Sequence, residues 1–168
     1  MKKEIELVRA RKEDAQLIHQ MKYESFLPLY EKYHDDETSP VKEDIDSLIC
    51  KIQQDWTDYY IIRFKGENAG AVRIRKHLKN DKYVDDIRHI SPIFILPKFQ
   101  NQGIGYRVLQ EIFKKYDNVA TWKLETIKQE QGNCHLYEKC GFVRIGEEKP
   151  VNDLMTLVDY EKLSHLQG

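Results

Sequence analysis

Hydrophobic and polar residues follow two different periods along this chain, and together they predict a mixture of strands and helices. Alternating or short apolar runs predict strands over residues 5–9, 59–64, 71–75, 87–96, 122–127, 142–145 and 154–158. Apolar residues at helical spacing predict four helices: one capped by Asp14 and ending by Pro28, one opening at Ser39-Pro40, one over residues 106–116 and a short one over residues 131–140. The predicted order is therefore β-α-α-β-β-β-α-β-α-β-β.

The connection before the third predicted helix carries the strongest chemical signal. It reads Gln100-Asn101-Gln102-Gly103-Ile104-Gly105 and joins an apolar strand to an amphipathic helix. Glycines at 103 and 105 leave room for a ligand beside the backbone, and the amides of a helix's first turn have no intrahelical partner, so the turn suits a pyrophosphate. A P-loop is disfavoured because Tyr106 stands where lysine is required. A dinucleotide fingerprint is disfavoured because Val108 replaces a glycine or alanine.

Length and composition narrow the class of protein. With 168 residues, the chain is long enough for one domain over residues 1–168 with a substantial core. Its 27 basic and 28 acidic residues balance, so general attraction to nucleic acid is not expected. Neither a signal segment nor an apolar stretch of transmembrane length is present, which predicts a cytoplasmic protein without a membrane partner. Cys50, Cys134 and Cys140 lack metal-type spacing, so no metal is predicted.

A second motif follows the glycine turn after about thirty residues and reads Leu136-Tyr137-Glu138-Lys139-Cys140-Gly141-Phe142. This segment and the Gln-x-x-Gly-x-Gly pattern of the turn together resemble the end of the fourth helix and the acetyl-CoA signature of the GCN5-related N-acetyltransferase (GNAT) family. The resemblance implies an α+β, three-layer acyl-CoA N-acyltransferase fold, in which helices flank a mixed, mainly antiparallel sheet of about seven strands. The fourth and fifth strands of that fold splay apart to admit acetyl-CoA.

The resemblance also implies which residues hold acetyl-CoA. The amides from residue 101 to 106 would bind its diphosphate, and the strand backbone around residue 94 would pair with the pantetheine arm. Glu130 stands where the family usually has an asparagine, and Asn133 is the asparagine that this chain offers nearby. The cofactor-binding residues expected in this way are Ile93, Phe94, Ile95, Gln100, Asn101, Gln102, Gly103, Ile104, Gly105, Tyr106 and Asn133. Lys98, Arg107 and Lys139 are candidates for the 3′-phosphate.

Acyl transfer from a thioester to an amine requires aligned reactants, an unprotonated amine and a proton for the departing thiolate. Tyr137 is the expected general acid, because the resemblance puts its hydroxyl near the thioester sulfur. Glu125 matches the glutamate base of some protein N-terminal acetyltransferases of the family. His89 matches the base position of histone-type members and has an ordinary pKa of about 6.5. A water chain is the third alternative, and Cys140 is expected to pack in the core rather than accept an acyl group.

The acceptor is expected to be a primary amine of a small molecule that attacks acetyl-CoA directly in a ternary complex. Aromatic residues alternate with acids over Tyr23 to Glu37, which the resemblance puts beside the acceptor, and both kinds of side chain attract an amine cation. A solvated acidic loop explains this composition equally well, and Asp85-Asp86 carries the same two interpretations. Acetylation of a protein or peptide amine and a noncatalytic acyl-CoA-binding module stay open. Edge strands near the C-terminal end would permit a homodimer.

Overall fold

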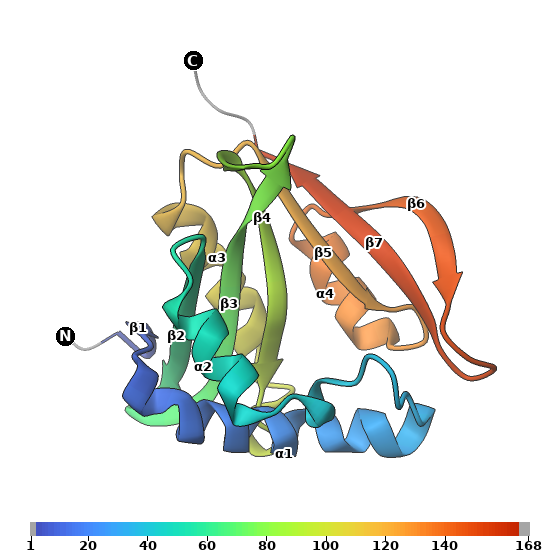
Figure 1. The fold of residues 1–168 in the computed structure, drawn as a ribbon, viewed down its shortest axis with the longest axis horizontal. Helices are drawn as coiled ribbons and strands as arrows, with labels where there is room; N and C mark the ends of the chain where they lie inside the picture. The colour runs from blue at the N-terminus through green and yellow to red at the C-terminus, as the bar shows by residue number, and fades with distance from the viewer. Residues whose placement is uncertain (1–2, 165–168) are drawn as a thin grey trace.

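The computed structural model describes residues 3–164, which build one seven-stranded sheet (Figure 1). The strands lie in the order β1-β2-β3-β4-β5-β7-β6, and every neighbouring pair is antiparallel except β4 and β5. The strands are β1 Ile5–Arg9, β2 Thr57–Phe64, β3 Glu67–Lys79, β4 Lys82–Ile95, β5 Thr121–Ile127, β6 Val143–Pro150 and β7 Thr156–Leu163. This sheet confirms the expected mixed, mainly antiparallel architecture. Residues 1–2 and 165–168 of the expected single domain lie outside the described residues.

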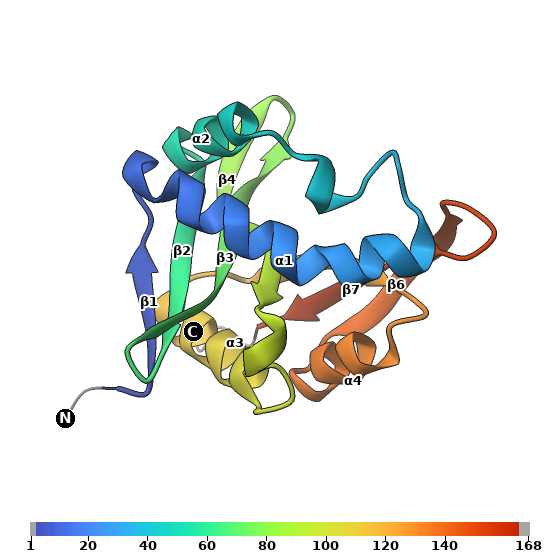
Figure 2. The ribbon, with the colours of Figure 1, turned by 90° about the horizontal axis from the view of Figure 1, so that it is seen from below.

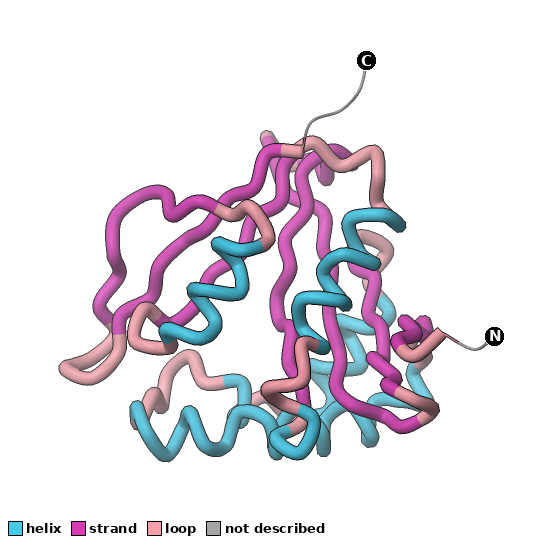
Figure 3. Tube along the Cα trace, turned by 180° about the vertical axis from the view of Figure 1, so that it is seen from behind, coloured by secondary structure: helices cyan, strands magenta, loops and turns pink. Residues whose placement is uncertain are grey.

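Helices cover both faces of the sheet and complete three layers (Figure 2). On one face lie α1 (Ala15–Tyr33) and α2 (Ile45–Gln53), and on the other lie α3 (Ile104–Lys115) and α4 (Gln131–Lys139). The view from behind shows α3 and α4 on either side of the line along which the two halves of the sheet diverge (Figure 3). None of the helices within residues 3–164 has the length and apolar character needed to span a lipid bilayer.

Burial of one face of α3 fixes the helix that follows the glycine turn. Ile104, Val108, Leu109 and Ile112 recur at helical spacing, and each is at most 1% exposed. They belong to the same buried cluster as Trp122 of β5. Burying a side chain of this size contributes about 1.5–3 kcal/mol relative to leaving it exposed. The expected helix face is confirmed, and it holds the first turn of α3 in a defined place on the sheet.

The neighbouring strands β4 and β5 pair over only part of their length. Their parallel pairing joins Ile87 to His89 with Thr121 to Lys123. Beyond this point β5 continues as a partner of β7, and β4 continues as a partner of β3, so the facing edges of β4 and β5 separate. The expected splay between the fourth and fifth strands is thereby confirmed.

The first helix differs from the sequence prediction at its C-terminal end. Pro28 lies inside α1, which continues to Tyr33 instead of ending by the proline. Proline removes one intrahelical hydrogen bond. The turn after it is held by the burial of Tyr33 and by His34, which adopts a left-handed conformation and donates its amide to the Tyr30 carbonyl at 2.8 Å. The prediction that α1 ends by Pro28 was wrong because packing outweighs this loss.

The second helix begins later than predicted. Ser39-Pro40 opens only a short 3-10 turn, Pro40–Lys42. The helix itself starts after Asp44, whose carboxylate accepts a hydrogen bond from the Ser47 amide at 2.8 Å. A cap of this kind satisfies one of the amides that the first turn leaves without a partner. Both serine-proline and aspartate are helix-start signals, and the sequence alone did not separate them.

The hairpin formed by β3 and β4 extends well beyond the apolar segments that predicted these strands. It closes at Asn80 and Asp81, which both adopt left-handed φ angles of 51° and 62°. Charged residues dominate this outer part of the hairpin, and they conceal the two-residue period that identifies a half-buried strand. The same reason explains why β6 and β7 continue to Pro150 and Leu163, beyond their predicted ends.

Candidate active site

The glycine turn forms a left-handed bend directly before α3. Asn101 and Gly103 have φ angles of 63° and 74°, and Gly103 is the N-terminal cap of the helix. The Arg107 amide donates to the Gly103 carbonyl at 3.2 Å and makes the first hydrogen bond of the helix. The amides of residues 104–106 precede this bond and have no partner within the helix. Three such amides at the positive end of a helix dipole fit a diphosphate.

Two glutamine side chains hold the shape of this loop. Gln100 donates its side-chain amide to the Ile95 carbonyl at 2.9 Å, which ties the loop to the end of β4. Gln102 donates to the Lys98 carbonyl at 3.3 Å. Because both side chains bond to backbone carbonyls of β4 and the loop, the main-chain amides of the loop are the groups that remain for a ligand.

The two glycines of the motif have different roles. A Cβ atom added at Gly103 would meet no atom within 4 Å, so this glycine provides a left-handed turn beside open space. A Cβ atom at Gly105 would lie 3.1 Å from Cδ2 of Leu136. Gly105 therefore allows α3 to approach α4 closely, and this second role was not apparent from the sequence.

The edge of β4 that faces the split carries the expected pantetheine strand. Ile93, Phe94 and Ile95 pair with β3 on their other side, where Gly70 lies opposite Ile95. A Cβ atom at Gly70 would overlap the Phe94 carbonyl oxygen, so the glycine is required for this close approach. The part of β4 after His89 has no β5 neighbour, which leaves its edge for an added extended chain.

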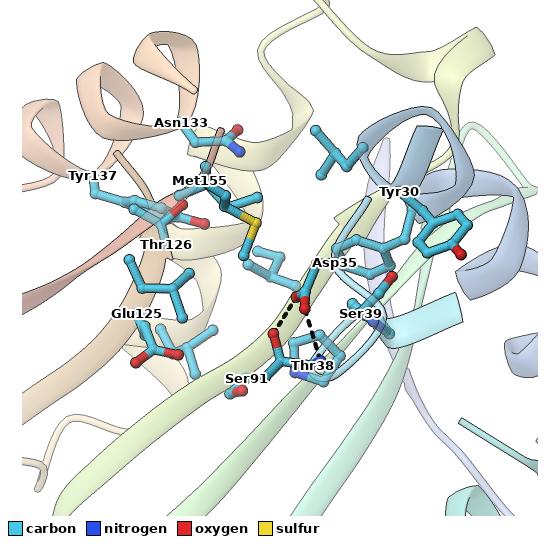
Figure 4. Close-up of a pocket in the computed structure, with 18 residues that line it drawn as sticks. Tyr30, Asp35, Thr38, Ser39, Ser91, Glu125, Thr126, Asn133, Tyr137 and Met155 are labelled. Atoms are coloured by element: carbon cyan, nitrogen blue, oxygen red, sulfur yellow. Dashed lines mark hydrogen bonds between the residues drawn. The ribbon is translucent and has the colours of Figure 1, made fainter. Parts of the chain in front are cut away.

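A cavity of about 240 Å³ lies where β4 and β5 separate (Figure 4). Its wall includes Tyr137 and Asn133 from α4, Glu125 from β5 and Ile93 from β4. Figure 4 shows Tyr30 and the end of α1 on the opposite side. The structure thus brings the expected general acid, one of the two base candidates and two expected cofactor contacts to one cavity.

Tyr137 is packed tightly by other aromatic rings. Its side chain is 7% exposed, and its ring centroid lies 6.0 Å from that of Phe142 and 6.1 Å from that of Tyr160. Burial raises the pKa of Tyr137 well above its ordinary value, followed by smaller effects of two nearby cysteines. The phenol therefore stays protonated at neutral pH, as a proton donor to a departing thiolate must.

Glu125 lies at the more exposed side of the same cavity, and its side chain is 46% exposed. It accepts a hydrogen bond from Lys149 of β6, whose ammonium also lies 3.0 Å from the Asp159 carboxylate. The hydrogen bond to Glu125 raises the pKa of Lys149, and Asp159 acts in the same direction. Glu125 and Asp159 together therefore already accommodate an amine cation.

The other base candidate, His89, lines a neighbouring cavity of about 360 Å³ that shares Glu125 with the first. Its Nε2 atom lies 2.7 Å from Nδ1 of His77. Burial lowers the pKa of His89 to about 4, and the charge of Arg75 acts in the same direction. His89 is therefore uncharged at neutral pH and binds a proton weakly. Of the two candidates, Glu125 is the one that shares a cavity with Tyr137.

Glu130, which replaces the family's usual asparagine, joins α4 to α1. Its carboxylate accepts hydrogen bonds from the Lys32 ammonium, at 2.8 Å, and from the Tyr33 hydroxyl. Burial acts to raise the pKa of Glu130, but these two hydrogen bonds outweigh it and hold the pKa below its ordinary value. The negative charge is thus paired with Lys32, which relieves the repulsion that an unpaired glutamate would exert on a diphosphate.

Acidic residues after α1 are largely occupied by the protein's own groups. Asp35 is 5% exposed, and its carboxylate accepts the Thr38 amide at 2.9 Å and the Thr38 hydroxyl. Asp36 accepts the Tyr30 hydroxyl at 2.5 Å. The Asp85-Asp86 pair lines neither cavity. Tyr23 to Tyr33 lie in α1, and the contacts of Asp35 and Asp36 favour a structured helix end over a row of acids awaiting a cation.

The three basic candidates for the 3′-phosphate have different surroundings. The Lys139 ammonium lies 4.3 Å from the ring centroid of Tyr106, beside the glycine turn. Lys98 lies in the loop itself, with its ammonium 4.9 Å from the Phe99 ring. Arg107 is already paired with an acidic residue of the N-terminal segment at 2.8 Å. Lys98 and Lys139 are therefore better suited than Arg107 to meet a further phosphate.

Several wall residues were not identified from the sequence. Ser91 stands two residues after His89, so the alternation of strands could have placed it on the same face. Thr126 directly follows Glu125, and alternation would have assigned it to the opposite face. Met155 comes from the connection between β6 and β7, which carries no motif. Arg75 lies opposite His89 in the β3–β4 ladder, a pairing that only the register provides.

Comparison with known proteins agrees with this geometry. The model of the acetyltransferase (GNAT) family matches residues 20–142. Because the match covers most of the chain, the protein belongs to the acetyltransferase (GNAT) family. It is accordingly an acetyl-CoA-dependent N-acyltransferase, which confirms the family, the enzyme class and the cosubstrate expected from the two motifs. No curated protein sequence matches the chain.

Solved structures share the fold at low sequence identity. They include an acetyltransferase from Thermus thermophilus, with 15% identity, a TM-score of 0.73 and coverage of 95% of this chain and 97% of that chain. A Vibrio cholerae spermidine N-acetyltransferase in complex with CoA and spermine has 20% identity and a TM-score of 0.73, with coverage of 95% of this chain and 95% of that chain. A Salmonella typhimurium acetyltransferase that modifies the N-terminal serine of ribosomal protein L7/L12 has 17% identity and a TM-score of 0.72, with coverage of 97% of this chain and 96% of that chain. These matches confirm the fold. They include one enzyme that acts on a small molecule and one that acts on a protein.

Replacement of Gly103 by alanine should weaken the binding of CoA. A residue with a Cβ atom in the left-handed conformation costs about 1 kcal/mol, so the turn relaxes and its amides move away from the arrangement that fits a diphosphate. We expect CoA to bind roughly fivefold more weakly by calorimetry. Gly66→Ala is the matched control, because Gly66 has a φ of 82°, also faces open space and lies in the β2–β3 hairpin. Equal CoA affinities in the two variants would contradict the prediction.

Proposed function

We propose that this enzyme acetylates a primary amine of a small molecule. The supporting observation is the way that three segments meet at Tyr33, at the end of α1. Asn152, in the connection between β6 and β7, donates its side-chain amide to the Tyr33 carbonyl at 2.9 Å, and Glu130 of the β5–α4 connection binds the Tyr33 hydroxyl. A peptide acceptor needs an open groove between these segments, whereas a small molecule needs an enclosed pocket. These hydrogen bonds join segments that flank the cavity, whose volume of about 240 Å³ suits a small acceptor.

Each requirement of acyl transfer can be assigned to a group of this chain. Acetyl-CoA supplies the activated acetyl thioester. The amides of residues 104–106 bind its diphosphate, and the open edge of β4 at Ile93 to Ile95 aligns the pantetheine arm. Glu125 removes a proton from the acceptor ammonium so that the amine can attack, and Tyr137 gives a proton to the departing thiolate. Both groups line the same cavity, which supports their joint action.

Direct transfer is favoured over an acyl-enzyme intermediate. Cys140 is 5% exposed and is not among the residues that line either cavity. Burial raises the pKa of Cys140, although the Gln110 hydrogen bond acts in the opposite direction. A thiol that is buried and protonated is a poor nucleophile. The acceptor amine therefore attacks the thioester itself.

The acceptor class is tested by measuring thiol release from acetyl-CoA with matched panels of small primary amines and of peptides with free N-termini or lysines. We expect turnover with members of the small-amine panel and little with peptides, because the cavity beside Tyr137 and Glu125 has a volume of only about 240 Å³. Preferential turnover of peptides would overturn the proposal while leaving the enzyme class intact.

Replacement of Tyr137 by phenylalanine should lower kcat by on the order of 10²-fold, because the thiolate would depart without a proton donor. The affinity for CoA, measured by calorimetry, should change little. Tyr116→Phe is the control, since Tyr116 is also buried but its hydroxyl binds Asp58 away from both cavities. Unchanged turnover in Tyr137→Phe would remove the proposed role.

Replacement of Glu125 by glutamine should lower kcat/KM most between pH 6 and 8, where an acceptor with an ordinary amine pKa of about 10.4 is protonated. The loss should shrink as the pH approaches that pKa, because the amine then needs no base. His89→Ala should keep the wild-type pH profile, since the His89 pKa of about 4 leaves it uncharged over this range. The opposite pattern would identify His89 as the base, and two unchanged profiles would favour a water chain.

A further inference from the structure

The second cavity contains a cation that the proposed mechanism does not use. Arg75 projects from β3 into this cavity of about 360 Å³ and lies directly opposite His89 in the β3–β4 ladder. His77 lines the same wall and contacts His89. The cavity reaches Glu125, which it shares with the cavity that holds Tyr137. A ligand that extends from the reaction centre along this face of the sheet would therefore meet Arg75.

Other cations around this cavity already have partners. Lys123 pairs with Glu161 at 2.9 Å, and Lys149 binds Asp159 at 3.0 Å together with Glu125. By contrast, Arg75 makes no ion pair and no side-chain hydrogen bond within residues 3–164, although it is only partly exposed.

The guanidinium of Arg75 is available to a ligand of the cavity. It offers five N–H donors in a planar fork, and no group within residues 3–164 occupies them. Burial lowers the pKa of Arg75, which is the effect expected of a cation that lacks a counter-charge. An anion in the cavity would supply this counter-charge and would be bound by charge-assisted hydrogen bonds.

We propose that Arg75, with His77 and His89 beside it, binds an anionic group of the acceptor, a carboxylate or a phosphate. The inference rests on the proposed small-molecule function and narrows it: the acceptor carries an amine at one end and an anion at the other. The amine end lies at Glu125, where a carboxylate pair already holds the Lys149 ammonium. The anionic end lies at Arg75.

The same arrangement disfavours an acceptor with ammonium groups at both ends. Such a molecule would bring its second cation against Arg75, and like charges repel. Toward the end of α1, Asp35 also lines the first cavity, and its carboxylate accepts hydrogen bonds from the Thr38 amide and hydroxyl. Arg75 therefore acts as a specificity residue that separates amino acids and aminophosphates from diamines.

Thiol-release kinetics with acceptors of matched chain length test this inference. The series are ω-amino carboxylates, aminoalkylphosphonates, diamines and simple alkylamines. For the wild-type enzyme we expect kcat/KM for one anionic series to exceed that for diamines by about tenfold or more. Arg75→Gln should remove this preference through KM and leave the rate with alkylamines unchanged, and Arg75→Glu should reverse it. Comparison of the carboxylate and phosphonate series shows whether the anionic group of the acceptor is a carboxylate or a phosphate.

Lys76→Gln is the matched control, because Lys76 is the next residue of β3 and pairs with Asp85 at 2.7 Å outside both cavities. It should keep the wild-type preference. Equal loss of rate with every acceptor in Arg75→Gln would indicate a structural role and overturn the inference. A wild-type preference for diamines or alkylamines would also overturn it, while leaving the small-molecule function intact.

Binding of an anion that cannot be acetylated separates the two proposals. Calorimetry with glutarate and with inorganic phosphate measures the anionic subsite directly, in the wild-type protein and in Arg75→Gln. Binding that is lost in Arg75→Gln but kept in Lys76→Gln would support the subsite, even if every small amine failed as an acceptor and the proposed function were withdrawn. The absence of binding to the wild-type protein would overturn the subsite.

Discussion

The partial pairing of β4 with β5 is the constraint on which the rest of the site depends. Each of these strands keeps a complete partner on its outer side, β3 for β4 and β7 for β5, so the sheet stays continuous while its centre opens. Backbone groups along the opened edge of β4 lose their strand partner, and an extended ligand can replace it. The glycine turn that follows β4 and Tyr137 on α4 are both positioned relative to this opening.

The parts of the fold that sequence reasoning predicted best are those with strong local patterns. The apolar face of α3 and the alternation of β5 are visible in any window of the sequence that contains them. Pro28 misled the prediction of α1, because contacts made by distant segments at Tyr33 outweigh a local signal. The outer β3–β4 hairpin was missed because its charged residues carry no apolar alternation.

The residues of the candidate site also fall into two groups: those that a local sequence pattern identifies and those whose place depends on distant parts of the chain. The glycine turn was found because its chemistry is contained in six consecutive residues. The choice between Glu125 and His89 could not be made from the sequence, since it depends on which cavity each strand residue lines. The contact between Glu130 and Tyr33 joins residues 97 positions apart, and the position of Arg75 depends on strand register. Such information exists only in the folded chain.

Tyr33 is attached by its hydroxyl to Glu130 and by its carbonyl to Asn152, and its side chain is 3% exposed. The end of α1 therefore cannot swing outward unless it releases two other segments of the chain at the same time. The wall that Leu29 and Tyr30 of α1 contribute to the first cavity is therefore a fixed part of the resting protein.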